Sequence, residues 1–339
     1  MKKSILLWSC LILTHTFSAQ ESIDDLLAAG ISDAQNFTSD YIAPATEGVA
    51  YAMNGGWFNN ASTFKQFGIE LSLIGNASLI KDEKKSFDLI PANYENIRFE
   101  DGSTSKMVAT ALGANDPDIT VIVTYDDPIF GNQEVELTLP TGIGSEGLSL
   151  IPSAYLQGSF SPLRGTQVKA RYFPKINTDD VDVSFYGFGI QQDFTSLIPV
   201  RRLLPFAVSG MVAYTHLDGS FDFTETGIVE GENQRINTEV NTWLFQLIAG
   251  TKLNIINFYG AVGYISGNST TDLLGTYRVS NGVLTSDEIK DPFSVDSKPS
   301  GITATIGTTL KLGFFGFNAA YNIGEFDTVS VGLNFGIRN

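Results

Sequence analysis

The chain has 339 residues, a formal net charge of −16 and a mean hydropathy of +0.05. So acidic a protein is a poor partner for nucleic acid and for anionic lipid, and we expect it to bind neither. It is rich in glycine (33), phenylalanine (24) and tyrosine (12) for a soluble acidic protein, yet no apolar run after residue 20 is long enough for a spanning helix. If the protein spans a membrane, its spanning segments must be β-strands.

Residues 1–19 have the three parts of a secretory signal. Lys2 and Lys3 precede an apolar run from Ile5 to Leu13, and the small pair Ser18-Ala19 follows. We expect cleavage after Ala19. An uncleaved anchor is the alternative, but the run is about half the roughly 20 residues that a spanning helix needs.

Cleavage would remove Cys10, the only cysteine, and His15, one of two histidines. A lipoprotein anchored at Cys10 would have too short an apolar region before the cysteine. With Cys10 and His15 removed, we expect neither a disulfide nor a zinc site in the mature chain. We expect no metal and no cofactor.

The segment 20–63 shows no alternation of apolar and polar residues. Ser22 predicts the start of a short helix that stops at Gly30, and Ser32 predicts a second helix that ends before Pro44. A glycine-rich, aromatic, turn-prone stretch follows at residues 51–61.

Outside a barrel, the apolar residues of such a segment would be exposed to water, whereas inside one they would be buried. We therefore predict that 20–63 is a short helical plug in the lumen. If apolar substrates pass, four aromatic residues are candidates for the ligand path, although packing against the inner wall is the stronger expectation for any one of them. These residues are Tyr41, Tyr51, Trp57 and Phe58.

Period-two alternation recurs along the rest of the chain. In the last run, Val331, Leu333 and Phe335 alternate with Gly332 and Asn334. Ten such strands are predicted, near 64–80, 148–160, 166–174, 181–194, 204–217, 239–251, 257–267, 300–311, 314–323 and 327–338.

We expect a further hairpin in 81–147, with candidate strands at 96–99, 119–125 and 134–139. Bacterial barrels have even strand numbers, so the prediction for residues 64–339 is an antiparallel up-and-down transmembrane β-barrel of about 12 strands, with 10 and 14 as alternatives. The fold class is all-β.

A soluble sandwich alternates in the same way with its apolar face inward, so connection lengths must decide. Short links at 161–165, 195–203, 252–256 and 311–314 interleave with connections at 175–180, 218–238, 268–299 and 324–327, two of which are long and acidic. Short turns at one end and longer loops at the other are typical of an outer-membrane barrel. We expect the cell outer membrane as its location, with membrane lipid and the barrel-assembly machinery as partners.

Several charged residues are predicted on inward faces. They could pair with one another or with the plug, which we favour, or form a substrate-selective lining. These residues are Glu70, Lys169, Arg171, Asp182, Lys311 and Arg338.

No motif predicts catalysis. The run Gly142–Gly147 matches a dinucleotide-binding fingerprint, but a strand follows it instead of a helix. His216, with Asp218 and Ser220 nearby, is the one histidine left for an acid–base role, and an interfacial histidine is the simpler interpretation. Acidic pairs in the loops lack the ligand spacing of a calcium site. We expect a protein that is not an enzyme.

Three short stretches carry a resemblance: Gly55 to Asn59 with Trp57 and Phe58, Arg171 to Lys175, and Tyr186 to Ile190. Over most of the mature chain they resemble an uncharacterised family of Gram-negative outer-membrane barrels, which implies no known activity. The layout of helical segment, turn and barrel also resembles the long-chain fatty-acid transporter (FadL-like) family, whose hatch blocks the lumen, and this supports transport only by analogy.

Three hypotheses for the function follow. The first is passive, porin-like transport of small hydrophobic molecules through the lumen, with residues 20–63 as the gate. The second is a non-transporting envelope protein that uses its acidic loops for surface interactions. An outer-membrane lipid-modifying enzyme is a third.

Overall fold

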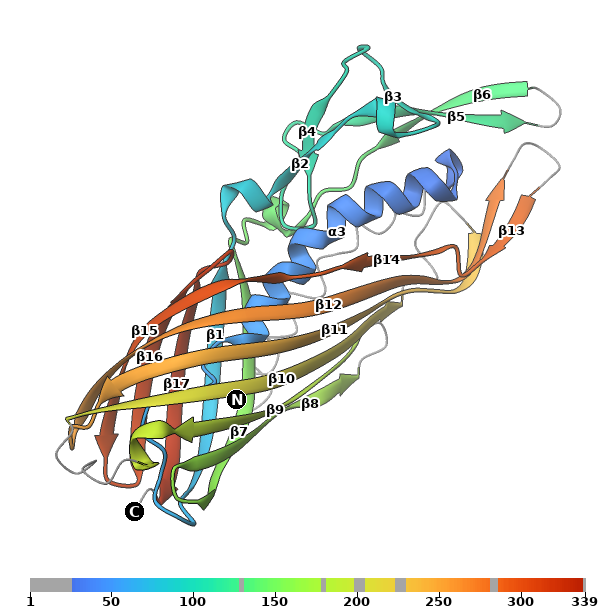
Figure 1. The fold of residues 1–339 in the computed structure, drawn as a ribbon. Coiled ribbons are helices and arrows are strands. Elements are labelled where there is room, and N and C mark those ends of the chain that lie inside the picture. Colours follow the sequence, from blue (N-terminus) through green and yellow to red (C-terminus); the bar gives the residue numbers. More distant parts are fainter. Residues whose placement is uncertain are drawn as a thin grey trace, which may run out of the picture.

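A computed structural model of the protein describes residues 26–127, 131–177, 181–197, 205–222, 230–280 and 286–337. The predicted signal segment 1–19 and Arg338 lie outside the described residues. The chain forms a closed antiparallel barrel, a long helix that enters it from one end, and a small β-rich unit beyond that end (Figure 1).

The barrel consists of ten strands, and β17 pairs with β1 to close it. Leu73, for example, lies between Leu333 of β17 and Leu156 of β7. The strands are β1 (Ile69–Leu79), β7 (Leu150–Leu163), β8 (Thr166–Asn177), β9 (Val181–Asp193), β10 (Phe206–Asp222), β11 (Glu230–Thr251), β12 (Ile256–Ser280), β15 (Ser300–Leu312), β16 (Phe315–Ile323) and β17 (Thr328–Ile337).

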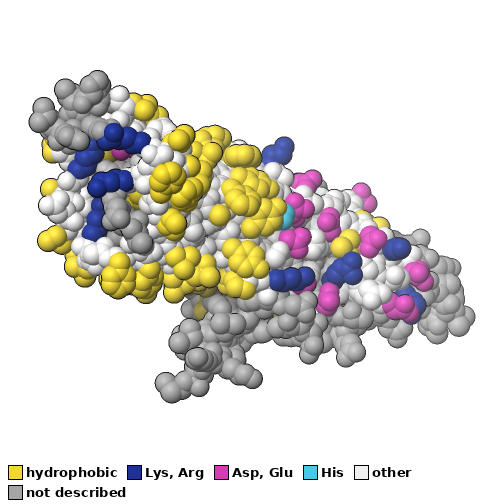
Figure 2. Space-filling model, turned by 90° about the horizontal axis from the view of Figure 1, so that it is seen from below, with side chains coloured by type: hydrophobic (Ala, Val, Ile, Leu, Met, Phe, Trp, Pro, Cys, Tyr) yellow, Lys and Arg dark blue, Asp and Glu magenta, His cyan; other side chains and the backbone are white. Residues whose placement is uncertain are grey.

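The alternating faces lie as the sequence predicts. Leu333 is 38% exposed on the outside, whereas its neighbour Asn334 is 1% exposed and faces the lumen. Figure 2 shows outward apolar side chains as a broad hydrophobic surface on the face of the barrel in view. A surface of this kind is stable only against lipid, because in water it would leave a large apolar area solvated.

The ten predicted strands are confirmed, but the extra hairpin that would make twelve is not part of the barrel. The candidate segments do form strands, yet a spanning strand needs about 9–11 residues and these have at most 8. They pair only with one another, in two small sheets outside the membrane belt: β2 (Ser86–Leu89) with β4 (Lys106–Ala109), and β3 (Ile97–Phe99) with β5 (Thr120–Asp127) and β6 (Gly131–Thr138).

The two ends of the barrel differ as expected. At one end, which we call the short-turn end, tight turns join β7 to β8, β11 to β12 and β15 to β16. At the other, the long-loop end, β10, β11 and β12 continue beyond the belt, with 17, 22 and 25 residues. Two short strands, β13 (Ser286–Lys290) and β14 (Phe293–Ser297), pair with the outer part of β12.

The helix α3 (Ile31–Asn54) begins at the long-loop end, just after the 3-10 turn η1 (Leu27–Ala29). The predicted stop before Pro44 is wrong, because the helix runs through that proline for ten more residues. Proline removes a single backbone donor, and the surrounding packing makes up for its loss. None of the described helices is long and apolar enough to span a bilayer.

The outer half of α3 lies between the extended strands and the small sheets. Residues 81–147, which we call the cap, cover it on one side, and β12 and β14 lie on the other (Figure 1). A single core joins the three layers, with Phe37 of the helix, Phe99 and Val121 of the cap, and Leu273 and Val295 of the extended strands. The cap also holds three 3-10 turns: η2 (Asp82–Lys84), η3 (Pro91–Asn93) and η4 (Ile143–Glu146).

The inner half of α3 and the coil that follows fill the lumen. Ala50 and Met53 pack against Ile74, Tyr155 and Val240 of the wall. We call residues 49–61 the plug. After the plug, the chain reaches the short-turn end, where β1 begins, so the described part of the predicted plug segment, residues 26–63, divides into an outer helical half and a lumenal half.

Candidate functional site: the latched plug and the cap

The barrel wall holds the plug by its backbone. Side chains from β7, β8, β9 and β15 donate hydrogen bonds to carbonyl oxygens of residues 52–60. The pairs are Ser153 to Ala52 (2.9 Å), Arg171 to Met53 (3.1 Å), Tyr155 to Gly55, Lys169 to Trp57 (2.9 Å), Thr309 to Asn59 and Gln191 to Asn60 (2.9 Å). Because the last carbonyls of α3 and those of the coil after it have no helical partners, these donors satisfy groups that would otherwise be buried unpaired.

Arg171 is the centre of this latch. Its guanidinium carbon lies 3.7 Å from the centroid of the Trp57 ring and 4.2 Å from that of Tyr155, so the plug and the wall each contribute one aromatic face. Its Nε donates to Oε1 of Gln157 at 2.7 Å. The arginine is 1% exposed, and cation–π contacts of this desolvated kind contribute about 2 kcal/mol or more.

Three of the predicted inward charges contact the plug. Arg171 and Lys169 bind its carbonyls, and Glu70 accepts a hydrogen bond from Nδ2 of Asn59 at 2.8 Å. All three are 5% exposed or less. These three inward charges therefore pair with the plug in this structure.

The other predicted charges lie elsewhere. Asp182 is on the outward face of β9, next to the inward Val181, and pairs with Lys175 at 2.7 Å near the long-loop end. It therefore does not line the lumen. Lys311 lies at the short-turn mouth, two residues after the buried Thr309, and is partly exposed.

The four predicted path residues are buried and do not share one cavity. Tyr41 lies in the outer core, where its hydroxyl donates to the Thr141 carbonyl oxygen at 3.0 Å. The other three, Tyr51, Trp57 and Phe58, lie in the lumen. The Tyr51 ring lies 6.0 Å from that of Phe326 between centroids, and the Phe58 ring lies 5.4 Å from that of Tyr259. Trp57 contacts the guanidinium of Arg171.

A pair of glycines makes room for Trp57. A Cβ at Gly187 would lie 3.1 Å from the Trp57 ring, and one at Gly189 would lie 3.0 Å from it. The sequence shows this pair as Tyr186-Gly-Phe-Gly, with the aromatic residues outward and the glycines inward. The inward glycines therefore form a flat recess for the largest side chain of the plug.

The cap is tied to the outer half of α3. The carboxylate of Asp33 accepts hydrogen bonds from the backbone N–H groups of Glu95 (2.9 Å) and Asn96 (2.8 Å). Further along the helix, Lys84 of the cap pairs with Glu47 at 2.7 Å. Cap, helix and plug are thus consecutive parts of one connected structure.

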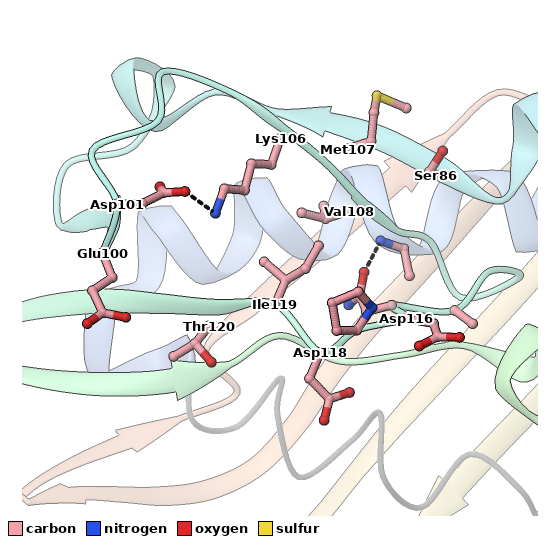
Figure 3. Close-up of a pocket in the computed structure, with 14 residues that line it drawn as sticks. Ser86, Glu100, Asp101, Lys106, Met107, Val108, Asp116, Asp118, Ile119 and Thr120 are labelled. Atoms are coloured by element: carbon pink, nitrogen blue, oxygen red, sulfur yellow. Dashed lines mark hydrogen bonds and ion pairs between the residues drawn. The ribbon is translucent and has the colours of Figure 1, made fainter.

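The cap contains a cleft of about 560 Å³ beside β4. Figure 3 shows Val108 and Ile119 at its floor and the ion pair between Lys106 and Asp101 (2.8 Å) across one side. The hydrogen bonds from Lys106 and Ser103 lower the pKa of Asp101 to about 2. Three more carboxylates line the cleft, so its charge is negative overall: Glu100, Asp116 and Asp118.

A model of one protein family matches residues 1–337 of the chain. The chain belongs to the family of unknown function DUF6588. No curated protein matches it. Membership of this family brings no activity with it, so the function must be argued from the structure.

Solved structures with some likeness include several outer-membrane barrels. They include Ail, the attachment invasion locus protein of Yersinia pestis (8% identity, TM-score 0.26, covering 80% of this chain and 100% of that one), and the outer membrane protein OprG from Pseudomonas aeruginosa (8%, 0.32, 83% and 100%). A Pseudomonas aeruginosa FadL homologue is a third (10%, 0.24, 80% and 89%). The FadL homologue is therefore one of several similar barrels. TM-scores this low support no inference about function.

The barrel itself decides the class of protein. A closed ring of ten antiparallel strands, an apolar belt outside and a polar lumen are the features of an outer-membrane barrel. The protein is an outer-membrane β-barrel. The wall donors Ser153, Tyr155 and Thr309 were not predicted, because a polar inward residue does not reveal which carbonyl it will meet.

Proposed function

We propose that this protein is a non-transporting surface-interaction protein, in which the barrel anchors the cap outside the outer membrane. One observation carries the proposal: α3 is a continuous helix that is packed under the cap at one end and latched in the lumen at the other. A plug built this way fixes the position of the cap, since the cap cannot move without breaking the helix or the latch.

The energetics favour a fixed plug. Displacing it would break the six backbone latches and the Arg171 stacking together and would expose Trp57, which is fully buried. Hydrogen bonds from charged donors such as Lys169 contribute about 1.5–3 kcal/mol each, and burial of a large aromatic side chain contributes about 1.5–3 kcal/mol. A resting plug of this kind supports anchoring better than gating.

Orientation is tested with epitope tags in intact cells. We expect a tag after Gly102, in an exposed turn of the cap, to bind antibody on intact cells, and a tag after Gly313, in the short turn between β15 and β16, to bind only after permeabilisation. Both glycines have a positive φ in a turn with open space around them, so the two insertions are matched. Labelling of Gly313 alone on intact cells would contradict the proposal.

Binding is tested on the purified full-length protein in detergent, with oligolysine and oligoglutamate as probes. The acidic cleft favours oligolysine, and we expect Asp116→Asn with Asp118→Asn to weaken its binding. Asp222→Asn, at the exposed end of β10, is the matched control. Equal binding by both variants would show that the cleft is not the interaction surface.

Transport of small hydrophobic molecules remains the alternative prediction, and the hydrogen-bonding groups that surround the plug are compatible with a hydrated lumen. It requires the plug to move. Single-channel recording of the full-length protein distinguishes the two functions: anchoring predicts no openings, whereas gating predicts openings that become frequent when Arg171→Ala weakens the latch.

A further inference from the structure

A hydrogen-bonded cluster lies on the outer wall of the barrel, on the lipid-facing sides of β10 and β11. Its centre is Asn241. The Asn241 Oδ1 accepts a hydrogen bond from the Tyr214 hydroxyl at 2.5 Å and lies 2.9 Å from Nδ1 of His216. The Asn241 Nδ2 donates to Oε1 of Glu239 at 2.7 Å. An outward surface facing lipid alone has no need for such a network.

Aromatic rings flank these polar groups. The Tyr186 ring lies 4.8 Å from that of His216 between centroids, at a tilt of 38°, and the Tyr214 ring lies 5.2 Å from that of Trp243. Tyr186 and Trp243 are 40% and 49% exposed, so their faces remain open to a ligand. We call Tyr186, Tyr214, His216, Glu239, Asn241 and Trp243 the wall cluster.

The wall cluster lies at the border of the membrane belt. Figure 2 shows a histidine side chain where the hydrophobic surface meets a region of acidic and basic side chains. Beyond His216 on β10 come Asp218 and Asp222, and beyond Asn241 on β11 comes Glu239. The cluster is therefore at the depth of lipid headgroups.

An apolar groove of about 730 Å³ crosses the three strands of the cluster and the neighbouring β12, on the membrane side of the cluster. Ile190, Val212 and Phe245 are among its lining residues, and Gly210, with the Phe194 ring over it, lies in its floor. Four residues farther along the same strands come Tyr186, His216 and Asn241, which is about 13 Å at the rise of a β-strand. Groove and cluster thus form one continuous amphipathic surface.

We propose that the outer wall of β9–β12 binds a single membrane lipid with an uncharged, hydroxyl-rich sugar headgroup, its acyl chain in the groove and its sugar on the wall cluster. Exposed aromatic rings stack on sugar faces, and the Glu239 carboxylate accepts hydrogen bonds from hydroxyl groups. The carboxylates of Glu239 and Asp218, which lie opposite each other in the register of β10 and β11, disfavour an anionic headgroup at this place. This site is separate from the cap cleft.

Trp243 provides the readout. The chain has three tryptophans, of which Trp8 is in the predicted signal and Trp57 is buried in the lumen, so a quencher in the lipid phase reports on Trp243. The protein is reconstituted in vesicles of phosphatidylcholine with brominated acyl chains, which quench its fluorescence. Unbrominated monogalactosyl diacylglycerol, phosphatidylethanolamine or phosphatidylglycerol is then added in increasing proportion. Trp243→Phe gives the background.

If the site prefers the galactolipid tenfold over phosphatidylcholine, fluorescence recovers at about a tenth of the mole fraction that simple dilution of the brominated lipid requires, and this is the result that we expect. The two phospholipids are expected to follow dilution. If all three lipids follow dilution, the wall is ordinary lipid-facing surface and the proposal fails. A preference for phosphatidylethanolamine or phosphatidylglycerol would overturn the sugar assignment.

Two variants test whether the lipid binds at this position. Asn241→Leu removes the centre of the cluster and Val212→Phe fills the groove, and each is expected to abolish the galactolipid preference. Ser300→Leu, on β15 at the level of the cluster, and Val331→Phe, on the outward face of β17, are the matched controls. Heat-modified migration on a gel confirms that each variant has folded. Equal preference in folded variants and controls would contradict the proposal.

Discussion

The guanidinium of Arg171 on β8 lies 3.7 Å from the ring centroid of Trp57 in the plug, and the same group is hydrogen-bonded to the carbonyl of Met53. One wall residue thus recognises both a side chain and the backbone of the plug. This pairing connects the barrel to the helix that supports the cap, and most consequences of the structure can be tested through it.

Arg171→Ala is expected to loosen the plug without opening the barrel wall. It removes two cation–π contacts and two hydrogen bonds, a loss of about 2–4 kcal/mol from the plug. With Ser62→Cys as a reporter, thiol labelling in detergent should become much faster in the Arg171→Ala background. Lys175→Ala, whose lysine is paired on the surface, is the control, and an equal labelling rate in both backgrounds would refute the latch.

Gly189→Ala is expected to destabilise the protein by about 1–3 kcal/mol, because the new Cβ would lie 3.0 Å from the Trp57 ring. Trp57→Leu frees that space, so the double variant should recover part of the loss caused by the glycine change. Gly158→Ala is the control, since a Cβ there meets nothing within 4 Å. The measurement is a double-mutant cycle of urea unfolding in detergent, and purely additive effects would show that ring and glycine do not interact.

Leu333→Arg is expected to impair assembly, because it places a cation at lipid depth on β17 at a cost of about 2–4 kcal/mol near the midplane. Ser294→Arg, on the exposed face of β14 beyond the belt, should be tolerated. Heat-modified gel migration measures the assembled fraction. The adjacent Asn334→Arg should also fail, since Asn334 is hydrogen-bonded to Ser72 and Asn318 and is buried, so the longer side chain has no room.

Alkaline pH is expected to melt the cap before the barrel. Tyr41 of α3 lies under the cap, and its burial there raises the pKa of its phenol above the ordinary value. The phenol therefore stays neutral in the folded protein, whereas in the unfolded chain it ionises near pH 10. The stabilisation is therefore complete below pH 10 and declines as the pH rises above it. Proteolysis of the cap across this range is the measurement, and Tyr41→Phe should shift the transition to higher pH. A transition unchanged by that substitution would assign it to other groups.

The sequence by itself determined the barrel. Ten runs with period two are enough to locate ten strands and to assign their faces, because alternation is a local property of the chain and lipid accepts only the apolar face. It also singled out Trp57, Lys169 and Arg171, since buried charge and large aromatics in a lumen need partners.

Only the tertiary structure decided what those partners are. Backbone carbonyls at Ala52 and Gly55 carry no sequence signal, so the donors Ser153 and Tyr155 could not be matched to them in advance. The path of α3 through Pro44 depended on packing from both sides, which no local pattern records. The sequence predicted the strands of 81–147 as a further barrel hairpin. Their length and the packing of this segment against Phe37 placed them in the cap, because a strand too short to cross the bilayer is stable only where another core covers it.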